Sequence, residues 1–266
     1  MSTNLSNKPN FKNSGRILEE QRVKELYDNH CFGEFNYNDV RHNHFPLAMS
    51  EIISADKNST LCDAGCGKGF WLETFEKSGF KKKNMTGIDI SPKNIELIKS
   101  RGFEGINESI LDLKSIQNNK YDYTHCNGVI HHTHNPDTAF SELVRITKSG
   151  GKIILAVYNQ WNPYFYIVHK ITFPIRWFYW NVSKRTASVF FIFWHLMALV
   201  ASFCLFGKFA DRATSETMMM DQVFTPYAFL FSKNKLRKLA ENNNCELEKI
   251  GIACKTLMYE AIIKKK

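Results

Sequence analysis

The stretch LCDAGCGKG at residues 61–69 decides the fold class of this chain. A short apolar run enters it, glycines follow at positions 65, 67 and 69, and a segment with helical spacing of apolar residues leaves it. Glycine lets the backbone turn tightly and approach a ligand that a Cβ would exclude. The free N–H groups at the start of a helix also suit a carboxylate or a phosphate. A strand, a glycine turn and a helix in this order predict a ligand-binding turn of an α/β fold.

Strands and helices alternate on both sides of this turn. We expect strands at 59–64, 85–88, 105–109, 121–126 and 152–158, and helices at 68–77, 91–102 and from Asn135 to the Gly150-Gly151 pair. After residue 158 the alternation stops, and it resumes with a helix from Ser232 and strands at 246–252 and 256–263. This pattern predicts a doubly wound, mostly parallel, seven-stranded sheet covered by helices on both faces.

The regions outside the sheet complete the expected domain organisation. Residues 1–15 are polar and rich in Asn and Ser, which predicts a flexible tail without the apolar centre of a signal peptide. Helical spacing at 19–27 and 39–53 predicts N-terminal helices within 16–54. We expect one domain, 16–266, with a hydrophobic insertion at 159–230. Seven cysteines without a CxxC pair indicate free thiols in a reducing cytoplasm rather than a disulfide scaffold.

Two carboxylates bear on which ligand the turn binds. A dinucleotide site has the pattern G-x-G-x-x-G, whereas here the third glycine comes one residue early and Phe70 takes its expected place. Asp63 lies two residues before the first glycine, where it favours a cationic ligand over a pyrophosphate. Asp89 follows Gly65 by 24 positions at the end of the second expected strand, a spacing typical of a carboxylate that binds ribose hydroxyls.

These motifs together resemble those of class I S-adenosylmethionine-dependent methyltransferases, and within them the UbiE-like, small-molecule group. The resemblance covers residues 55–158 well and rests on the segments DAGCGKG (63–69), Asp89, SILDL (109–113), YDY (121–123), NGVIHH (127–132) and GGK (150–152). It implies a Rossmann-like sheet whose last strand is antiparallel, with an apolar helical insertion before the final helix and strands. It also implies S-adenosyl-L-methionine as the cofactor.

The resemblance also assigns cofactor contacts to individual residues. The implied cofactor-binding residues are Asp63, Ala64, Gly65, Gly67, Asp89, Ile90, Ser109, Ile110, Asn127 and Gly128. The glycine turn would line the methionine part of the cofactor and Asp89 would bind the ribose. Ile90 would pack on the adenine, Ser109 and Ile110 would meet the adenine edge, and Asn127 and Gly128 would lie beside the methyl donor. Ser109 stands where many relatives have Asp, so it would be a neutral partner for the adenine amine.

A histidine cluster follows the fourth expected strand. His132 is a candidate general base or substrate orienter, because imidazole titrates near neutrality. The alternative is a structural histidine at a helix start, bonded to the backbone. His42 and His44 add an H-x-H spacing, but no carboxylate or cysteine pattern completes a metal site, so we expect no metal.

The insertion holds the longest apolar run, TASVFFIFWHLMALVASFCLFG at residues 186–207. About 20 apolar residues suffice to span a membrane. A single crossing would place the last two strands on the wrong side of the bilayer, so we expect an interfacial or re-entrant segment, a lid, or a homodimer contact. Aromatic residues mixed with Arg and Lys between positions 160 and 207 favour contact with a membrane surface.

The sequence therefore predicts a methyltransferase that acts on a lipophilic small molecule, such as a quinone precursor, a lipid or a secondary metabolite. We expect it in the cytoplasm, with peripheral membrane association as a further expectation. The net charge of +9 leaves an RNA methyltransferase open as an alternative. The sequence has neither a separate RNA-binding motif nor a basic aromatic platform, so we expect no nucleic-acid partner. A non-catalytic, cofactor-binding membrane protein is the other alternative.

Overall fold

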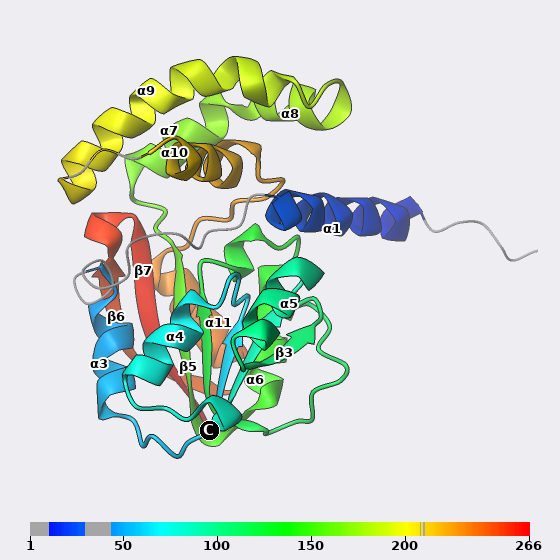
Figure 1. Cartoon of the computed structure of the whole chain (residues 1–266). Coiled ribbons are helices and arrows are strands. Elements are labelled where there is room, and N and C mark those ends of the chain that lie inside the picture. The colour runs from blue at the N-terminus through cyan, green and yellow to red at the C-terminus, as the bar shows by residue number, and fades with distance from the viewer. Residues whose placement is uncertain (1–10, 30–43, 208, 210) are drawn as a thin grey trace, which may run out of the picture.

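The computed structural model describes residues 11–29, 44–207, 209 and 211–266, and it contains one mixed sheet with helices on both faces and a helical cap above it (Figure 1). The strands are β1 (Leu61–Ala64), β2 (Met85–Asp89), β3 (Glu104–Asn107), β4 (Tyr121–Asn127), β5 (Thr147–Tyr158), β6 (Cys245–Ala253) and β7 (Met258–Lys265). The helices that flank the sheet are α3 (Pro46–Ser54), α4 (Phe70–Lys77), α5 (Pro92–Ser100), α6 (Pro136–Ile146) and α11 (Lys233–Asn242). Short 3-10 helices lie at Lys82–Asn84, Ile130–His132 and Cys254–Thr256.

The seven strands follow the order β3-β2-β1-β4-β5-β7-β6. Strands β1 to β5 pair in parallel, whereas β7 is antiparallel to both of its neighbours, β5 and β6. The prediction of a doubly wound, mostly parallel sheet with an antiparallel last strand is confirmed. The chain order reverses between β1 and β4, and ligands of open α/β sheets bind at the carboxyl ends of the strands at such a point.

Strand β5 alternates its side chains between two separate cores. Ile153 and Leu155 of β5 pack with α6 and α11, whereas Ile154 between them packs with α3, α4 and α5. This alternation follows from the pleat of a strand, which points successive side chains to opposite faces. Because both faces are covered, β1 and β2 consist entirely of buried residues. The sheet is therefore a rigid platform whose exposed features lie at its edges.

Some element boundaries differ from those predicted. β3 ends at Asn107, so Ser109 lies in the following loop rather than in the strand. β5 begins at Thr147, five residues before the predicted start, because Thr147 already pairs with Tyr121 of β4. The Gly150-Gly151 pair lies inside β5 and does not end a helix. A Cβ on Gly151 would lie 2.8 Å from the carbonyl oxygen of Asp122, which explains why glycine occupies this position.

The N-terminal region also differs in its boundaries. Helix α1 (Phe11–Asn29) begins before the predicted helix at 19–27 and includes the last five residues of the predicted tail. Of the predicted helix at 39–53, the structure describes α3 from Pro46 onward, and residues 39–43 lie outside the described part. Leu26 of α1 is buried against the cap, so α1 is held by tertiary packing.

A buried glutamate joins α3 to the sheet. The side chain of Glu260 on β7 accepts hydrogen bonds from the backbone N–H groups of Leu47 and Ala48, both at 3.0 Å. Burial raises the pKa of Glu260 to about 7. A residue from a distant strand therefore satisfies the free N–H groups at the start of α3, and no local capping residue is needed.

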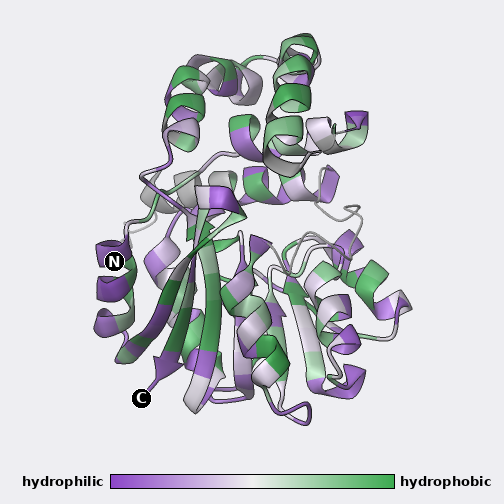
Figure 2. Cartoon of the chain, turned by 90° about the vertical axis from the view of Figure 1, so that its left-hand side faces the viewer, coloured by the Kyte–Doolittle hydropathy of each residue, from purple (hydrophilic) through white to green (hydrophobic). Residues whose placement is uncertain are grey.

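The insertion forms a cap of four helices over the carboxyl ends of the parallel strands (Figure 1). They are α7 (Pro163–Ile171), α8 (Phe173–Asn181), α9 (Thr186–Phe206) and α10 (Arg212–Met219), and a π-helix, η3 (Met220–Phe224), follows α10. Tyr179, Trp194, Val223 and Phe224 form its buried centre together with Leu26 of α1. Figure 2 shows that hydrophobic residues occupy much of these cap helices.

Candidate functional site

The glycine turn after β1 is joined to the end of β2 by backbone hydrogen bonds. The N–H groups of Gly65 and Cys66 both donate to the carbonyl oxygen of Ile88, at 2.7 and 2.9 Å. The turn then leads into α4, whose N-cap is Gly69 in the left-handed conformation. The predicted order of strand, glycine turn and helix is confirmed, although α4 begins two residues later than expected.

Gly65 is required by a protein contact at its own position. It has a φ of +80°, and a Cβ built on it would lie 2.3 Å from a methyl carbon of Val129. Val129 belongs to the loop that leaves β4, so the close approach brings the ends of β1 and β4 together. Gly128 in the same loop has a φ of +78°, and a Cβ there would meet open space. Gly65 thus serves packing, while Gly128 leaves room at the edge of the sheet.

Asp89 connects the glycine turn to the start of α5. Its carboxylate accepts hydrogen bonds from the N–H of Gly67 at 2.8 Å, the N–H of Ser91 at 2.9 Å and the side-chain amide of Asn94 at 3.1 Å. Burial raises the pKa of Asp89 although these three donors oppose the shift. The prediction that Asp89 lies beside the glycine turn is confirmed. Its contact with ribose stays a prediction, and the three protein donors add a role that the sequence did not indicate.

Asp63 has a different environment from the one predicted. One of its carboxylate oxygens lies 2.7 Å from Nδ1 of His125 on the neighbouring strand β4, and both side chains are buried. The ring of His125 packs on Trp71, with ring centroids 4.5 Å apart. Within the described part of the chain, the second oxygen of Asp63 has no hydrogen-bond partner. Asp63 is therefore held by a protein histidine first, and only this second oxygen is free for a ligand.

The expected adenine-side residues lie on the loops that follow β2 and β3. Ile90 is half-buried, Ile110 is buried, and the hydroxyl of Ser109 accepts a hydrogen bond from the N–H of Leu111 at 3.3 Å. The side-chain amide of Asn107 donates to the carbonyl oxygens of Asp89 and Ile90, which joins the two loops.

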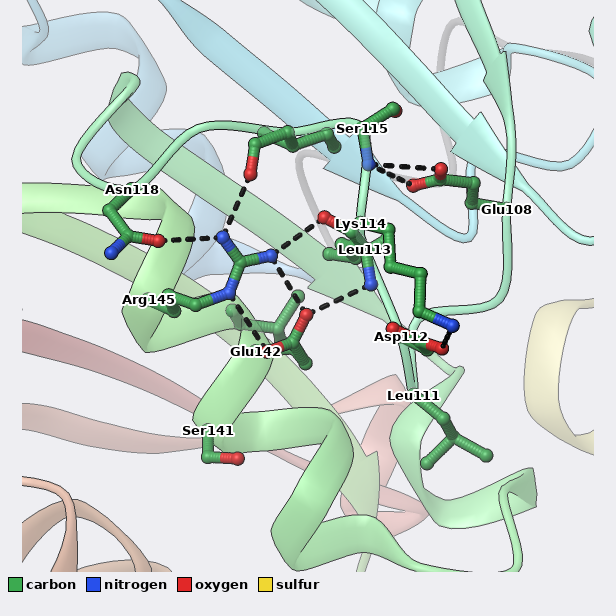
Figure 3. A network of polar contacts seen from close by, with 12 residues as sticks. Glu108, Leu111, Asp112, Leu113, Lys114, Ser115, Asn118, Ser141, Glu142 and Arg145 are labelled. Carbon is green, nitrogen blue, oxygen red and sulfur yellow. Dashed lines mark hydrogen bonds and ion pairs between the residues drawn. The ribbon is translucent and has the colours of Figure 1, made fainter.

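Arg145 on α6 fixes the rest of the loop between β3 and β4 (Figure 3). Its guanidinium donates to the carbonyl oxygens of Leu113 and Ile116 at 2.7 and 2.8 Å and pairs with Glu142. Glu142 in turn accepts a hydrogen bond from the N–H of Leu113 at 2.9 Å, and its contact with Arg145 lowers the pKa of the Glu142 carboxyl. This network holds in place the loop that carries Ser109 and Ile110.

Asn127 is the last residue of β4 and Gly128 follows it, so both lie at the end of the fourth strand as predicted. Their position beside the methyl donor stays a prediction. The N–H of Gly128 donates to the carbonyl oxygen of Ala156 on β5 at 3.0 Å. The side-chain nitrogen of Asn127 is buried and has no hydrogen-bond partner in the described residues. Native proteins rarely leave such a donor unpaired, so it marks a position where a ligand or water binds.

A cavity opens next to this edge. Its volume is about 330 Å³, and it is lined by Asp28, Asn29, Lys68, Lys93, Asn94, Leu97 and Thr217. It therefore lies between the glycine turn, α5, the end of α1 and α10. Asn94 connects the cavity wall to the carboxylate of Asp89.

A second polar cluster lies under the cap, centred on Asp221 of η3. Its two carboxylate oxygens accept hydrogen bonds from the hydroxyls of Tyr27 on α1, at 2.8 Å, and of Tyr158 at the end of β5, at 2.7 Å. Nε2 of His132 lies 3.5 Å from Asp221. We refer to Tyr27, His132, Tyr158 and Asp221 as the Asp221 cluster. It brings together segments that are up to 194 positions apart in the sequence.

His132 is orientated by the backbone of the segment after η3. Its Nδ1 lies 2.7 Å from the carbonyl oxygen of Tyr227. A carbonyl oxygen only accepts hydrogen bonds, so Nδ1 carries a proton. Burial lowers the pKa of His132, while the nearby Asp221 opposes this shift. The ring is therefore neutral near pH 7, with an unprotonated Nε2 that has no hydrogen-bond partner among the described residues.

The sequence prediction gave no role to Asp221 or Tyr158. The available signal was the segment MMMDQVF at residues 218–224, in which one acidic residue lies in an apolar run. A carboxylate buried by such neighbours needs partners. No group of three or more His, Cys, Asp or Glu residues within the described ranges could hold a metal ion; His42 lies outside those ranges.

The comparisons with known proteins agree with this geometry. The family described as "Methyltransferase domain" matches residues 62–155. The ubiquinone biosynthesis O-methyltransferase of Nitrosomonas europaea is 28% identical over 125 residues, which cover 45% of this chain and 52% of that protein. The tRNA (carboxymethyluridine(34)-5-O)-methyltransferase alkbh8 of Xenopus tropicalis is 29% identical over 152 residues, 55% of this chain and 22% of that protein. The chain thus spans about half the length, or less, of these relatives.

Solved structures share the fold. A SAM-dependent methyltransferase from Methanosarcina mazei superposes with a TM-score of 0.53 at 17% identity, covering 84% of this chain and 98% of that one. The 1,6-didemethyltoxoflavin-N1-methyltransferase of Burkholderia thailandensis gives a TM-score of 0.55 at 13% identity, covering 99% and 94%.

Residues 62–155 form an S-adenosylmethionine-dependent methyltransferase domain, and the chain has the class I methyltransferase fold. The match to the family covers the glycine turn, Asp89 and the β4 loop, which are the features that the structure brings to one edge of the sheet.

The edge of the methyltransferase sheet fits this cofactor. The free oxygen of Asp63 suits a cationic amino group, and the unpaired amide nitrogen of Asn127 lies two residues further along the paired strand. Asp89 uses three protein donors, and a carboxylate has about four lone-pair positions, so it can accept one more hydrogen bond. The cofactor supplies an activated methyl group, and these residues of the chain would hold and orient it.

Replacing Asp89 tests this assignment. We expect Asp89→Ala to weaken binding of S-adenosylhomocysteine by at least about tenfold, since one charge-assisted hydrogen bond is lost and the glycine turn loses its anchor. Leaving the three donors unpaired should also cost about 1–3 kcal/mol of the free energy of unfolding. Isothermal titration calorimetry and thermal unfolding measure the two effects.

Asp112→Ala is the matched control, because Asp112 is a more exposed carboxylate on the adjacent loop whose partner is Lys114. If Asp89→Ala does not fold, Asp89→Asn retains one acceptor oxygen and the same shape. Unchanged affinity in a folded Asp89 variant would contradict the ribose assignment.

Proposed function

We propose that this methyltransferase transfers the methyl group to a hydroxyl of a lipophilic small molecule, with His132 as the general base. The Asp221 cluster carries this proposal, because it places a neutral histidine and a carboxylate beneath an aromatic cap. An acceptor with an apolar body and one acidic hydroxyl matches such surroundings. Quinone precursors, lipids and secondary metabolites include molecules of this kind.

The base role of His132 rests on its tautomer. Since Nδ1 donates to the Tyr227 carbonyl oxygen, Nε2 is the nitrogen with a free lone pair. A hydroxyl held beside Nε2 would give its proton to the ring as its oxygen accepts the methyl group, and the carbon–sulfur bond of the bound sulfonium would break to leave S-adenosylhomocysteine. The in-line displacement itself needs mostly orientation, which can supply about 7–11 kcal/mol of the barrier. General-base assistance contributes typically about 10²–10⁴-fold in addition.

Asp221 supports the protonated form of this base. Its carboxylate lies 3.5 Å from Nε2 of His132, so it favours the imidazolium that proton transfer produces. The hydroxyls of Tyr27 and Tyr158 hold the carboxylate in position from two other elements. Burial raises the pKa of Tyr158 well above its usual range, so this hydroxyl remains a donor. Asp221 thus faces the nitrogen that would take up the proton, while the Tyr227 carbonyl oxygen holds the opposite nitrogen of the ring.

The curated relatives support a hydroxyl acceptor. Several matched proteins are ubiquinone biosynthesis O-methyltransferases, at 27–29% identity over parts of this chain. Their names describe O-methylation in the biosynthesis of ubiquinone, which is a small molecule. The cap, which is rich in Phe, Tyr and Trp, provides the apolar surroundings that such an acceptor needs.

A tRNA nucleoside is the second candidate acceptor. The similarity to a tRNA methyltransferase of Xenopus tropicalis favours it, as does the net charge of +9. RNA binding requires basic residues that follow the phosphate backbone. The exposed surface of the cap is instead rich in large apolar side chains, which is why we place RNA second. A protein that binds the cofactor without turnover is the remaining alternative.

A labelling experiment separates these acceptors. Purified protein is incubated with methyl-labelled S-adenosylmethionine and with lipid, small-molecule, RNA and protein fractions of a cell extract. We expect the label in the organic phase. Label in RNA would replace our acceptor with the second candidate, and no label in any fraction despite cofactor binding would favour the non-catalytic alternative.

His132→Asn tests the base. Asparagine retains a side-chain nitrogen close to the position of Nδ1, so the bond to Tyr227 can persist while Nε2 is removed. We expect kcat for the identified acceptor to fall by about 10²–10⁴-fold with unchanged cofactor affinity. Because burial lowers the pKa of His132, the acid limb of the wild-type profile of kcat should lie below pH 6.5, and the variant should lack it.

His134→Asn is the matched control, since His134 is a partly exposed histidine two residues after His132 and lies outside the Asp221 cluster. Equal kcat values and equal pH profiles for wild type and His132→Asn would remove His132 from the reaction.

A further inference from the structure

Helix α9 has one face fixed to the cap and an opposite face that is apolar and exposed. Trp194, Ala198 and Ser202 are buried at a spacing of four residues. The indole N–H of Trp194 donates to the carbonyl oxygen of Ser215 on α10 at 3.1 Å, which anchors the middle of α9. The other face exposes half or more of seven large side chains: Val189, Ile192, Phe193, Leu196, Met197, Val200 and Phe203. We refer to these seven residues as the α9 patch.

Such a continuous patch needs an occupant. Soluble monomers rarely expose large contiguous apolar surfaces, and those that do use them for binding. The segment Thr186–Cys204 has a mean hydropathy of 2.0, so it is long and apolar enough to cross a membrane. Only 18% of this stretch is buried inside the protein. A crossing is excluded by the fold, because β6 and β7 follow α9 in the chain and pair with β5 in the same sheet. The patch is therefore suited to lie along a surface.

The charges around α9 indicate what kind of surface this is. From residue 159 to residue 210 the sequence has no Asp or Glu, whereas it has Lys170, Arg176, Lys184, Arg185 and Lys208. Of these, Lys170, Lys184 and Arg185 are exposed in the structure, and Lys184 also pairs with Glu25 of α1 at 3.1 Å. The first acidic residues after the helix are Asp211 and Glu216. Basic residues beside an apolar helix favour an anionic lipid surface.

The same charges argue against a second copy of the chain as the occupant. Basic residues flank both ends of α9, with Lys184 and Arg185 before it and Lys208 and Arg212 after it. Two α9 helices packed face to face would bring like charges together in either orientation. An aromatic side chain of the neighbouring helix also fits a lipid interface, since Trp177 of α8 is 54% exposed and α8 packs against α9.

We infer that α9 lies in the plane of an anionic phospholipid bilayer, with the α9 patch buried among the acyl chains near the headgroups. Figure 1 shows α9 at the outer side of the cap, away from the sheet, so the helix can meet a membrane without contact by the sheet. The inference goes beyond the acceptor chemistry, because binding to a membrane can be measured without any turnover.

Vesicle sedimentation tests this inference with the full chain. Vesicles of phosphatidylcholine alone are compared with vesicles of equal parts phosphatidylcholine and phosphatidylglycerol. We expect the protein to sediment with the anionic vesicles and more weakly with the neutral ones. Added salt should weaken binding to the anionic vesicles and leave binding to the neutral ones largely unchanged. Absence of binding to either vesicle would overturn the inference.

The double variant Phe193→Ser, Leu196→Ser localises the contact, because both side chains are more than half exposed and their loss should not disturb the core. We expect at least about tenfold weaker vesicle affinity. Ile53→Ser with Ile252→Ser is the matched control, since these residues on α3 and β6 are 59% and 50% exposed but lie outside the cap. Thermal unfolding and titration with S-adenosylhomocysteine verify that both double variants are folded.

Two further outcomes would contradict the inference. Equal vesicle affinity of the α9 variant and the control would show that the patch does not meet lipid. A lipid-free dimer that becomes a monomer in the α9 variant, without vesicle binding by the wild type, would assign the patch to a second copy of the chain.

Loss of vesicle binding by the α9 variant, with persistent methylation of a dispersed acceptor, would show that the membrane contact is independent of the proposed function.

Discussion

The hydrogen bond between the N–H of Gly67 and the carboxylate of Asp89 joins the two parts of the cofactor edge. It fixes the glycine turn after β1 against the end of β2, and the same carboxylate begins α5 through Ser91 and Asn94. Because Asp89 is buried, these donors stabilise the charge that burial opposes. The turn is thus preorganised before any ligand arrives. The close contact between Gly65 and Val129 likewise holds the ends of β1 and β4 next to each other.

A second constraint acts above this edge. The carboxylate of Asp221 accepts hydrogen bonds from the hydroxyls of Tyr27 on α1 and Tyr158 on β5. One carboxylate of the cap therefore connects the cap to the N-terminal helix and to the sheet. A buried carboxylate without partners would destabilise the cap strongly, so the two tyrosines stabilise the cap through this carboxylate. The cap therefore combines two properties. Its inner side presents a polar cluster with His132, and its outer side presents the apolar α9 patch.

The sequence alone predicted the sheet, its antiparallel strand and the position of the glycine turn, because local patterns encode them. The spacing of Gly65, Gly67 and Asp89 placed these residues at one edge correctly. The partners of Asp63 and Asp221 could not be predicted, since His125 and Tyr27 come from segments that only the folded chain brings near. The same reason explains Glu260, which caps α3 from more than 200 positions away. Long-range contacts between polar side chains leave no periodic signal in the sequence.

The central claim is that the glycine turn and Asp89 hold a sulfonium nucleoside and not a dinucleotide. Calorimetric titration of the purified chain with S-adenosylhomocysteine, and separately with NAD, tests it most directly. We expect saturable one-site binding of S-adenosylhomocysteine and no heat of binding with NAD. Saturable binding of NAD, with no response to S-adenosylhomocysteine, would contradict it.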